Sequence, residues 1–263
     1  MHRRTLLHGL AATLVASTGT THAQVRDFND AVNKAGRQRM LSQRMGKAWL
    51  ALVHKPGNDS ARAVLDQSMA LFDRQLVELK AFAPNAQIQG TYAQLEAAWS
   101  AHKLALVGSV PAKSGAETLL AADARVLALA HQGTVQYEAA AGKPVAILVN
   151  VAGRQRMLSQ RMAKFYLAAL LPVQEQVATA EIAKARTEFL AALEQLRTAP
   201  QATDRIREEL QLAQGQWVFF DAALQRLQPG AQAARQIAEV FTASENLLTS
   251  LDRVTGLYAA QTA

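Results

Sequence analysis

The sequence predicts an all-α protein built from two tandem antiparallel four-helix bundle units. The first observation is a repeat, because the segment AGRQRMLSQRM occupies residues 35–45 and again residues 152–162. The second is composition: half of the residues are hydrophobic and only 6% are aromatic, with many strong helix formers such as Ala, Leu and Gln. The third is the placement of the 7 Pro residues, all of which fall between long stretches that favour helix.

Residues 1–23 have the pattern of a signal peptide. A positively charged start at residues 2–4 precedes a short apolar stretch at residues 6–16, and residues 21–23 (Thr-His-Ala) offer a cleavage site. The Arg pair at residues 3–4 also fits a twin-arginine signal, so both the Sec and the twin-arginine routes remain open. We expect a periplasmic protein whose mature chain does not span the membrane, because no other stretch is long and apolar enough.

The exact repeat belongs to a larger duplication. Residues 33–47 and 150–164 agree at all but two positions, and weaker similarities such as Phe72 with Phe189 keep the same spacing. A unit of this length is far longer than a solenoid repeat. We therefore predict one helical domain over residues 24–142 and a second over residues 143–263. The join between them is short, so the two units should pack tightly.

Chain breakers divide each unit into four predicted helices. Those of the first unit are residues 27–54, 59–82, 86–108 and 116–141, and those of the second are residues 145–171, 173–198, 202–227 and 231–260. Long helices joined by short loops favour antiparallel bundles. Residues 145–151 also resemble a strand, but the matching segment of the first unit is typical of a helix, so we predict helix there.

The repeated segment places an arginine inside a stripe of small residues. On a helix, Gly36, Ser42 and Gln43 lie on the same face as Arg39, and the second unit repeats this arrangement around Arg156. An arginine there is costly to bury unpaired, yet residues 33–51 and 146–172 contain no Asp or Glu. Its partner must come from another helix or be an external anion.

Two such arginines could form one site. A guanidinium presents a planar fork of donors that suits carboxylate, phosphate or nitrate. If the two helices pack across a pseudo-twofold axis, as in an intrachain dimer, Arg39 and Arg156 can close on one anion. From the faces alone, structural pairing is as good an interpretation as anion binding. The remaining arginines of the segment project to the opposite side, and we interpret them as structural: Arg37, Arg44, Arg154 and Arg161.

Composition excludes several other functions. There is no Cys, and the His residues show no metal-ligand spacing, so no metal site, haem or other cofactor is expected. No Gly-rich phosphate loop or nucleophile–base pair is visible, so the protein is not expected to be an enzyme. The net charge of +7 suits small anions or acidic partners, but the basic runs with interleaved aromatics of a nucleic-acid binder are missing.

The run Asn33-x-Ala35-Gly36-x-x-Arg39-Met40-x-Ser42-x-Arg44-Met45 resembles the P-box, the first-helix signature of PilJ-type sensor domains. These domains occur in type IV pilus chemoreceptors and nitrate/nitrite sensor kinases. The resemblance is repeated from Asn150 to Met162. It implies a periplasmic four-helix bundle in which nitrate or nitrite binds between two first helices, held by the P-box arginine. The predicted ligand-binding residues are Arg39, Arg156, Gly36, Gly153, Gln43, Gln160, Asn33 and Asn150.

The resemblance also implies a partner. Family members usually carry transmembrane helices and a cytoplasmic signalling region, and the sequence shows neither. We therefore expect a binding protein for nitrate or nitrite that signals through a separate membrane protein. The alternative is a protein-interaction module, in which the repeated face docks a membrane receptor or a pilus component without any small ligand.

Overall fold

The computed structural model describes residues 24–171, 173–227 and 233–261. The predicted signal peptide, Pro172 and the predicted break at Pro229-Gly230 lie outside these residues. The described chain forms eight α-helices, a short 3₁₀ helix at Lys113–Gly115, and no strand, which confirms the all-α prediction. The helices are α1 (Phe28–His54), α2 (Asp59–Phe82), α3 (Ala86–Val107), α4 (Ala116–Ala141), α5 (Pro144–Leu170), α6 (Glu175–Thr198), α7 (Asp204–Leu224) and α8 (Ala233–Ala259).

The helix ends follow local chemistry. The side chain of Asn58 accepts a hydrogen bond from the Ala61 amide at 3.1 Å and so caps α2, as its polarity suggested. At the other end of the first copy, Gly142 adopts a left-handed φ of 62° and ends α4. Pro144 then occupies the first turn of α5, where its missing amide hydrogen costs nothing. This join of two residues turns the chain directly from the first copy, α1–α4, into the second, α5–α8.

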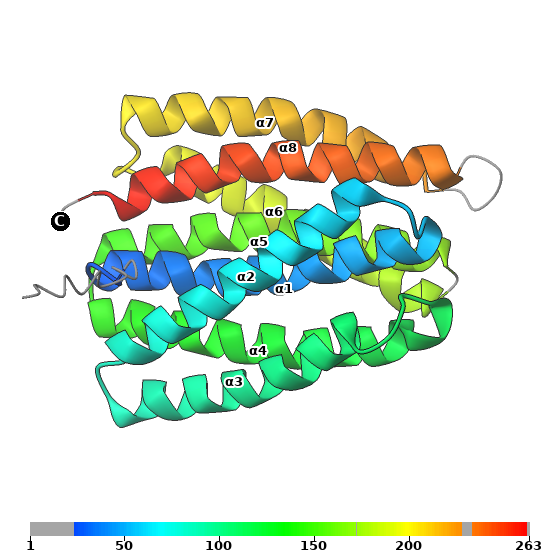
Figure 1. Cartoon of the computed structure of the whole chain (residues 1–263). Helices are drawn as coiled ribbons and strands as arrows, with labels where there is room; N and C mark the ends of the chain where they lie inside the picture. Colours follow the sequence, from blue (N-terminus) through cyan, green and yellow to red (C-terminus); the bar gives the residue numbers. More distant parts are fainter. Residues whose placement is uncertain (1–23, 172, 228–232, 262–263) are drawn as a thin grey trace, which may run out of the picture.

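The first helix of each copy lies at the centre of the molecule. Helices α1 and α5 pack against each other, with α2 and α4 on α1 and with α6 and α8 on α5. Helices α3 and α7 lie farther out, packed on α4 and α8 respectively (Figure 1). Among the described helices, none is long and apolar enough to cross a membrane.

The two copies share the same interior. Phe72 stacks on Trp99 with ring centroids 4.2 Å apart, and Phe189 stacks on Trp217 at 4.4 Å. Each stack joins the second helix of its copy to the third. Such pairs add to the free energy of burial because of their offset geometry. The duplication seen in the sequence is therefore also a duplication of packing.

Candidate functional site

The two central helices meet at a pair of glycines. A Cβ atom added to Gly36 would lie 3.7 Å from the Cα of Gly153, and one added to Gly153 would lie 3.7 Å from the Cα of Gly36. Larger side chains would hold the two backbones apart. The small-residue stripes predicted on the two helices thus face each other, and the two backbones approach closely where the sequence repeats.

Arg39 and Arg156 meet at this crossing. One terminal nitrogen of each guanidinium lies within 4 Å of the point where a Cβ of Gly36 would stand, and the same two nitrogens lie within 4 Å of the corresponding point at Gly153. Arg39 is 1% exposed and Arg156 is fully buried. The structure therefore places two guanidinium groups, one from each copy, beside a single interface.

Each arginine bonds to an asparagine of the other copy. Arg39 Nη2 donates to Asn150 Oδ1 at 2.7 Å and to the Asn150 backbone carbonyl at 3.3 Å. Arg156 Nη2 donates in the same way to Asn33 Oδ1 at 2.9 Å and to the Asn33 carbonyl at 3.1 Å. This reciprocal exchange is the pattern expected of a twofold interface. Asn33 and Asn150, both predicted ligand-binding residues, thus already accept hydrogen bonds from the two predicted arginines.

The two glutamines of the predicted site point elsewhere. Gln43 donates to Asp123 on α4 at 2.9 Å, and Gln160 donates to the backbone carbonyl of Ser244 on α8 at 3.0 Å. Each glutamine fastens the first helix of its copy to the fourth helix. Neither bonds to Arg39 or Arg156 in this structure.

Comparison with known proteins identifies the family. The family model described as the type IV pili methyl-accepting chemotaxis transducer N-terminal domain, PilJ, matches residues 20–130 and again residues 139–257. The chain belongs to the PilJ family. Two copies of the PilJ domain follow each other in it, as the repeat predicted. No curated protein and no solved structure matches the chain.

The symmetry of the two PilJ copies is broken in the fourth helices. Tyr137 on α4 and Tyr258 on α8 donate to equivalent carbonyls, of Leu79 and Leu196, at 2.6 and 3.1 Å, which sets the two helices in register. In this register His131 stands in the first copy where Asp252 stands in the second. The environments of the two P-box arginines therefore differ.

Asp252 neutralises the arginine of the second copy. Its Oδ1 accepts hydrogen bonds from Arg156 Nη1 and, at 2.8 Å, from Arg37 Nη2 of the first copy. Burial would raise the pKa of Asp252, but Arg156 and Arg37 outweigh that effect and hold the pKa well below its ordinary value. The carboxylate is therefore ionised and bridges two guanidinium groups.

His131 leaves the arginine of the first copy without such a counterion. Arg39 Nη1 lies 3.3 Å from His131 Nδ1, and no carboxylate of the described residues forms an ion pair with Arg39. Burial, Arg154 and Arg156 lower the pKa of Arg39 to about 9 and outweigh the opposite effect of Glu138, so the guanidinium remains charged at neutral pH. Burial, Arg39 and Arg154 also lower the pKa of His131, which is consequently neutral there.

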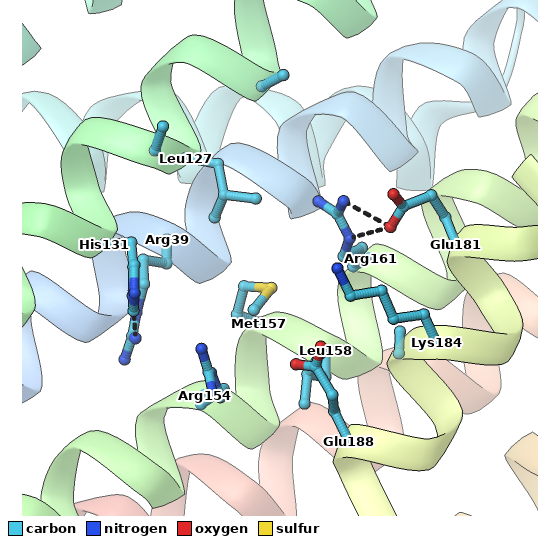
Figure 2. Close-up of a pocket in the computed structure, with 13 residues that line it drawn as sticks. Arg39, Leu127, His131, Arg154, Met157, Leu158, Arg161, Glu181, Lys184 and Glu188 are labelled. Carbon is cyan, nitrogen blue, oxygen red and sulfur yellow. Dashed lines mark hydrogen bonds and ion pairs between the residues drawn. The ribbon is translucent and has the colours of Figure 1, made fainter. Parts of the chain in front are cut away.

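Three of the four flanking arginines are structural, as interpreted from the sequence. Arg37 pairs with Asp252, Arg44 bonds to Glu245 at 3.1 Å, and Arg161 bonds to Glu181 at 2.7 Å. Arg154 differs from them: among the described residues it has no hydrogen bond or ion pair from its side chain. Instead it lines a pocket of about 280 Å³ that Arg39 and His131 also line (Figure 2).

Two buried lysines were not singled out from the sequence. Lys47 is fully buried and donates to Glu245 at 2.6 Å, and Lys164, 1% exposed, bonds to Asp123. Each lysine joins the first helix of one copy to the fourth helix of the other. Burial lowers the pKa of Lys47 to about 8 even though Glu245 opposes the shift. Each lysine is the last residue of the 15-residue repeat. This repetition was the signal in the sequence that could have pointed to the two lysines.

Proposed function

We propose that this PilJ protein is an exported sensor that binds a small oxyanion, nitrate or nitrite, where α1 crosses α5. The observation that carries the proposal is the convergence of Arg39 and Arg156 at the Gly36–Gly153 contact. The site has an excess of positive charge, because Asp252 neutralises only one of the two arginines. The resemblance to the P-box of nitrate sensors points to the same two residues.

The binding step needs little rearrangement. A planar oxyanion would accept the arginine hydrogen bonds that the side chains of Asn33 and Asn150 now accept, and the two carboxamides would turn aside. Both asparagines accept through a carboxamide oxygen as well as through their backbone carbonyl, so only side-chain bonds have to be exchanged, among them the bond that the Asn150 carboxamide donates to Glu138. Hydrogen bonds from a guanidinium to an anion are stronger than those to a neutral amide, which favours the exchange.

No chemistry follows binding in this proposal. The anion would change how α1 packs against α5, and a separate membrane signalling protein would read that change. Residues 1–23 would direct the protein to the periplasm. The alternative hypothesis, docking of a partner on the repeated face, lacks the surface that it needs, because Gly36 and Gly153 already face each other.

Isothermal titration calorimetry of the purified protein with nitrate, nitrite, sulfate and acetate tests the proposal. We expect saturable heat with nitrate or nitrite and a loss of at least tenfold in affinity in Arg39→Lys and in Arg156→Lys, since lysine keeps the charge but lacks the fork. Arg125→Lys, on the exposed side of α4, is the matched control.

Thermal unfolding gives a second readout. Ligand at 100 times its Kd should stabilise the protein by about 2.7 kcal/mol. Circular dichroism confirms that each variant is folded. If none of the four anions gives heat, or if Arg39→Lys and Arg156→Lys together leave the affinity unchanged, the proposed site is wrong.

A further inference from the structure

The second copy carries an internal carboxylate where the first copy has a pocket. Asp252 of the second copy bridges Arg156 and Arg37, and its counterpart in the first copy is His131. The arginines equivalent to Arg156 and Arg37 are Arg39 and Arg154. These two have no bridging carboxylate among the described residues. The Asp252 carboxylate therefore shows what kind of group could bridge Arg39 and Arg154.

A second carboxylate is replaced two helical turns earlier on the same helices. Glu245 on α8 pairs with Arg44 and Lys47, whereas Ala124 stands at the equivalent place on α4. Ala124 contributes a methyl group to the wall of the pocket instead of a charge. Neither carboxylate is thus repeated at its equivalent position on α4. The adjacent acid, Asp123, is bonded to Lys164 and does not pair with Arg39 or Arg154.

The pocket is a groove between the two copies with distinct ends. Figure 2 shows Arg39, His131 and Arg154 together at one end. Leu127 of α4 and Met157 of α5 line its middle, where the wall is apolar. A charged group at the first end would meet donors, and a hydrocarbon body would meet the middle. The volume of about 280 Å³ is just below the usual range for small-molecule sites, so the ligand must be small.

Charges at the far end balance one another. Arg161 is bonded to Glu181 at 2.7 Å, and Lys184 and Glu188 also lie there (Figure 2). A second anionic group on the ligand would meet carboxylates as well as cations at this end. The distribution of charge along the groove thus fits one negative group, at the Arg39 end only.

We propose that this groove binds a small organic monocarboxylate with an apolar body. The carboxylate bridges Arg39 and Arg154 as Asp252 bridges Arg156 and Arg37, and the body lies against Leu127 and Met157. This site goes beyond the oxyanion site at the α1–α5 crossing: it uses Arg154 and His131, and it does not use Arg156. The two sites share only Arg39, so they can be tested separately.

Benzoate and hexanoate are suitable probes, with benzamide and hexanamide as neutral controls of similar shape. Calorimetry on the purified full chain should show at least one carboxylate binding ten times or more tightly than its amide. Arg154→Gln should weaken that binding at least tenfold. Arg37→Gln, the equivalent change at the Asp252 site, should leave it unchanged and is the matched control.

His131→Asp is the sharpest variant. It supplies the first copy with the carboxylate that Asp252 supplies to the second, so the fold should be kept and the carboxylate probes should no longer bind. Nitrogen-15 spectra of the histidine side chains locate the site, because benzoate should shift the signals of His131 and leave those of His54 unchanged. Melting by circular dichroism confirms that the variant is folded.

The outcomes separate the two proposals. Nitrate binding that depends on Arg156, with no preference for benzoate over benzamide, overturns the groove proposal alone. Benzoate binding that is lost in His131→Asp but kept in Arg156→Lys, with no heat from nitrate, supports the groove and overturns the oxyanion site. Benzoate binding that survives both His131→Asp and Arg154→Gln shows that the probe binds elsewhere and rejects the groove.

Discussion

Breaking the buried ion pair between Asp123 and Lys164, which joins the two copies, should destabilise the protein strongly. The Asp123 side chain is fully buried and that of Lys164 is 2% exposed, and Gln43 also donates to the carboxylate. Removing one partner of such a pair leaves an uncompensated buried charge, which costs about 3–5 kcal/mol. We expect Asp123→Asn to lower the free energy of unfolding by this amount, a large part of the roughly 5–15 kcal/mol of a typical protein.

Urea unfolding followed by circular dichroism measures the effect. Replacing both partners, in Asp123→Asn with Lys164→Met, removes both charges and should recover most of the loss, giving a coupling energy of at least about 2 kcal/mol. The matched control is the exposed pair Lys80–Glu96, whose side chains are 36% and 50% exposed. Glu96→Gln should cost less than about 1 kcal/mol.

The pH dependence gives the sign of the effect. In the wild type, burial would raise the pKa of Asp123 but Lys164 outweighs it and lowers the pKa, so stability from this group is lost as pH falls. In Lys164→Met the largest opposing effect is gone, so burial should raise the pKa and the variant should regain stability as pH falls from 8 to 5. A cost below about 1 kcal/mol for either single variant, or the same pH slope in Lys164→Met and the wild type, would refute the reasoning.

Two further predictions concern the central helices. Lys47 and Arg44 overcome the effect of burial and hold the pKa of Glu245 at about 2, below its ordinary 4.5, so stability should fall as pH drops from 5 to 2. Urea midpoints of the wild type and Glu245→Gln should converge over that range; a constant difference would contradict the prediction. A Cβ on Gly36 would lie 3.1 Å from Arg39 Nη2, whereas one on Gly153 has no contact shorter than 3.4 Å. Because the gain in helix propensity is the same, Gly36→Ala should be less stable than Gly153→Ala by roughly 1 kcal/mol, the size of one strained hydrogen bond; the reverse order in urea would exclude this.

The helices could be predicted because their signals are local. Proline positions and capping residues such as Asn58 depend only on neighbouring residues, and they placed most helix ends within a few residues. Helices α6 and α7 begin later than predicted. In α7, Thr203 caps the helix by accepting a hydrogen bond from the Ile206 amide at 3.3 Å, so the helix begins at Asp204 instead of Ala202. Residues able to cap a helix can be recognised in a sequence, but where several polar residues follow one another, each of them could be the N-cap.

The bonding partners of the candidate site could not be predicted in the same way. Asn33 and Asn150 lie nearly two turns before the arginines of their own helices, yet each bonds to the arginine of the other copy. Gln43 lies on the predicted face but reaches Asp123, 80 residues away. Which atoms meet across a helix interface depends on its register and crossing, and neither is encoded in the spacing of one helix.

The sequence by itself determined that the chain is a duplicated helical domain and that each copy has a P-box arginine with no acid in the neighbouring turns of its own helix. It thereby required a partner from elsewhere for Arg39 and for Arg156. Only the tertiary structure decided that Asp252 is the partner of Arg156, 96 residues away, and that His131 stands in that place for Arg39. The reason is that α4 and α8 diverged in sequence while keeping their packing on the central helices. One arginine received an internal carboxylate, and the other faces a pocket.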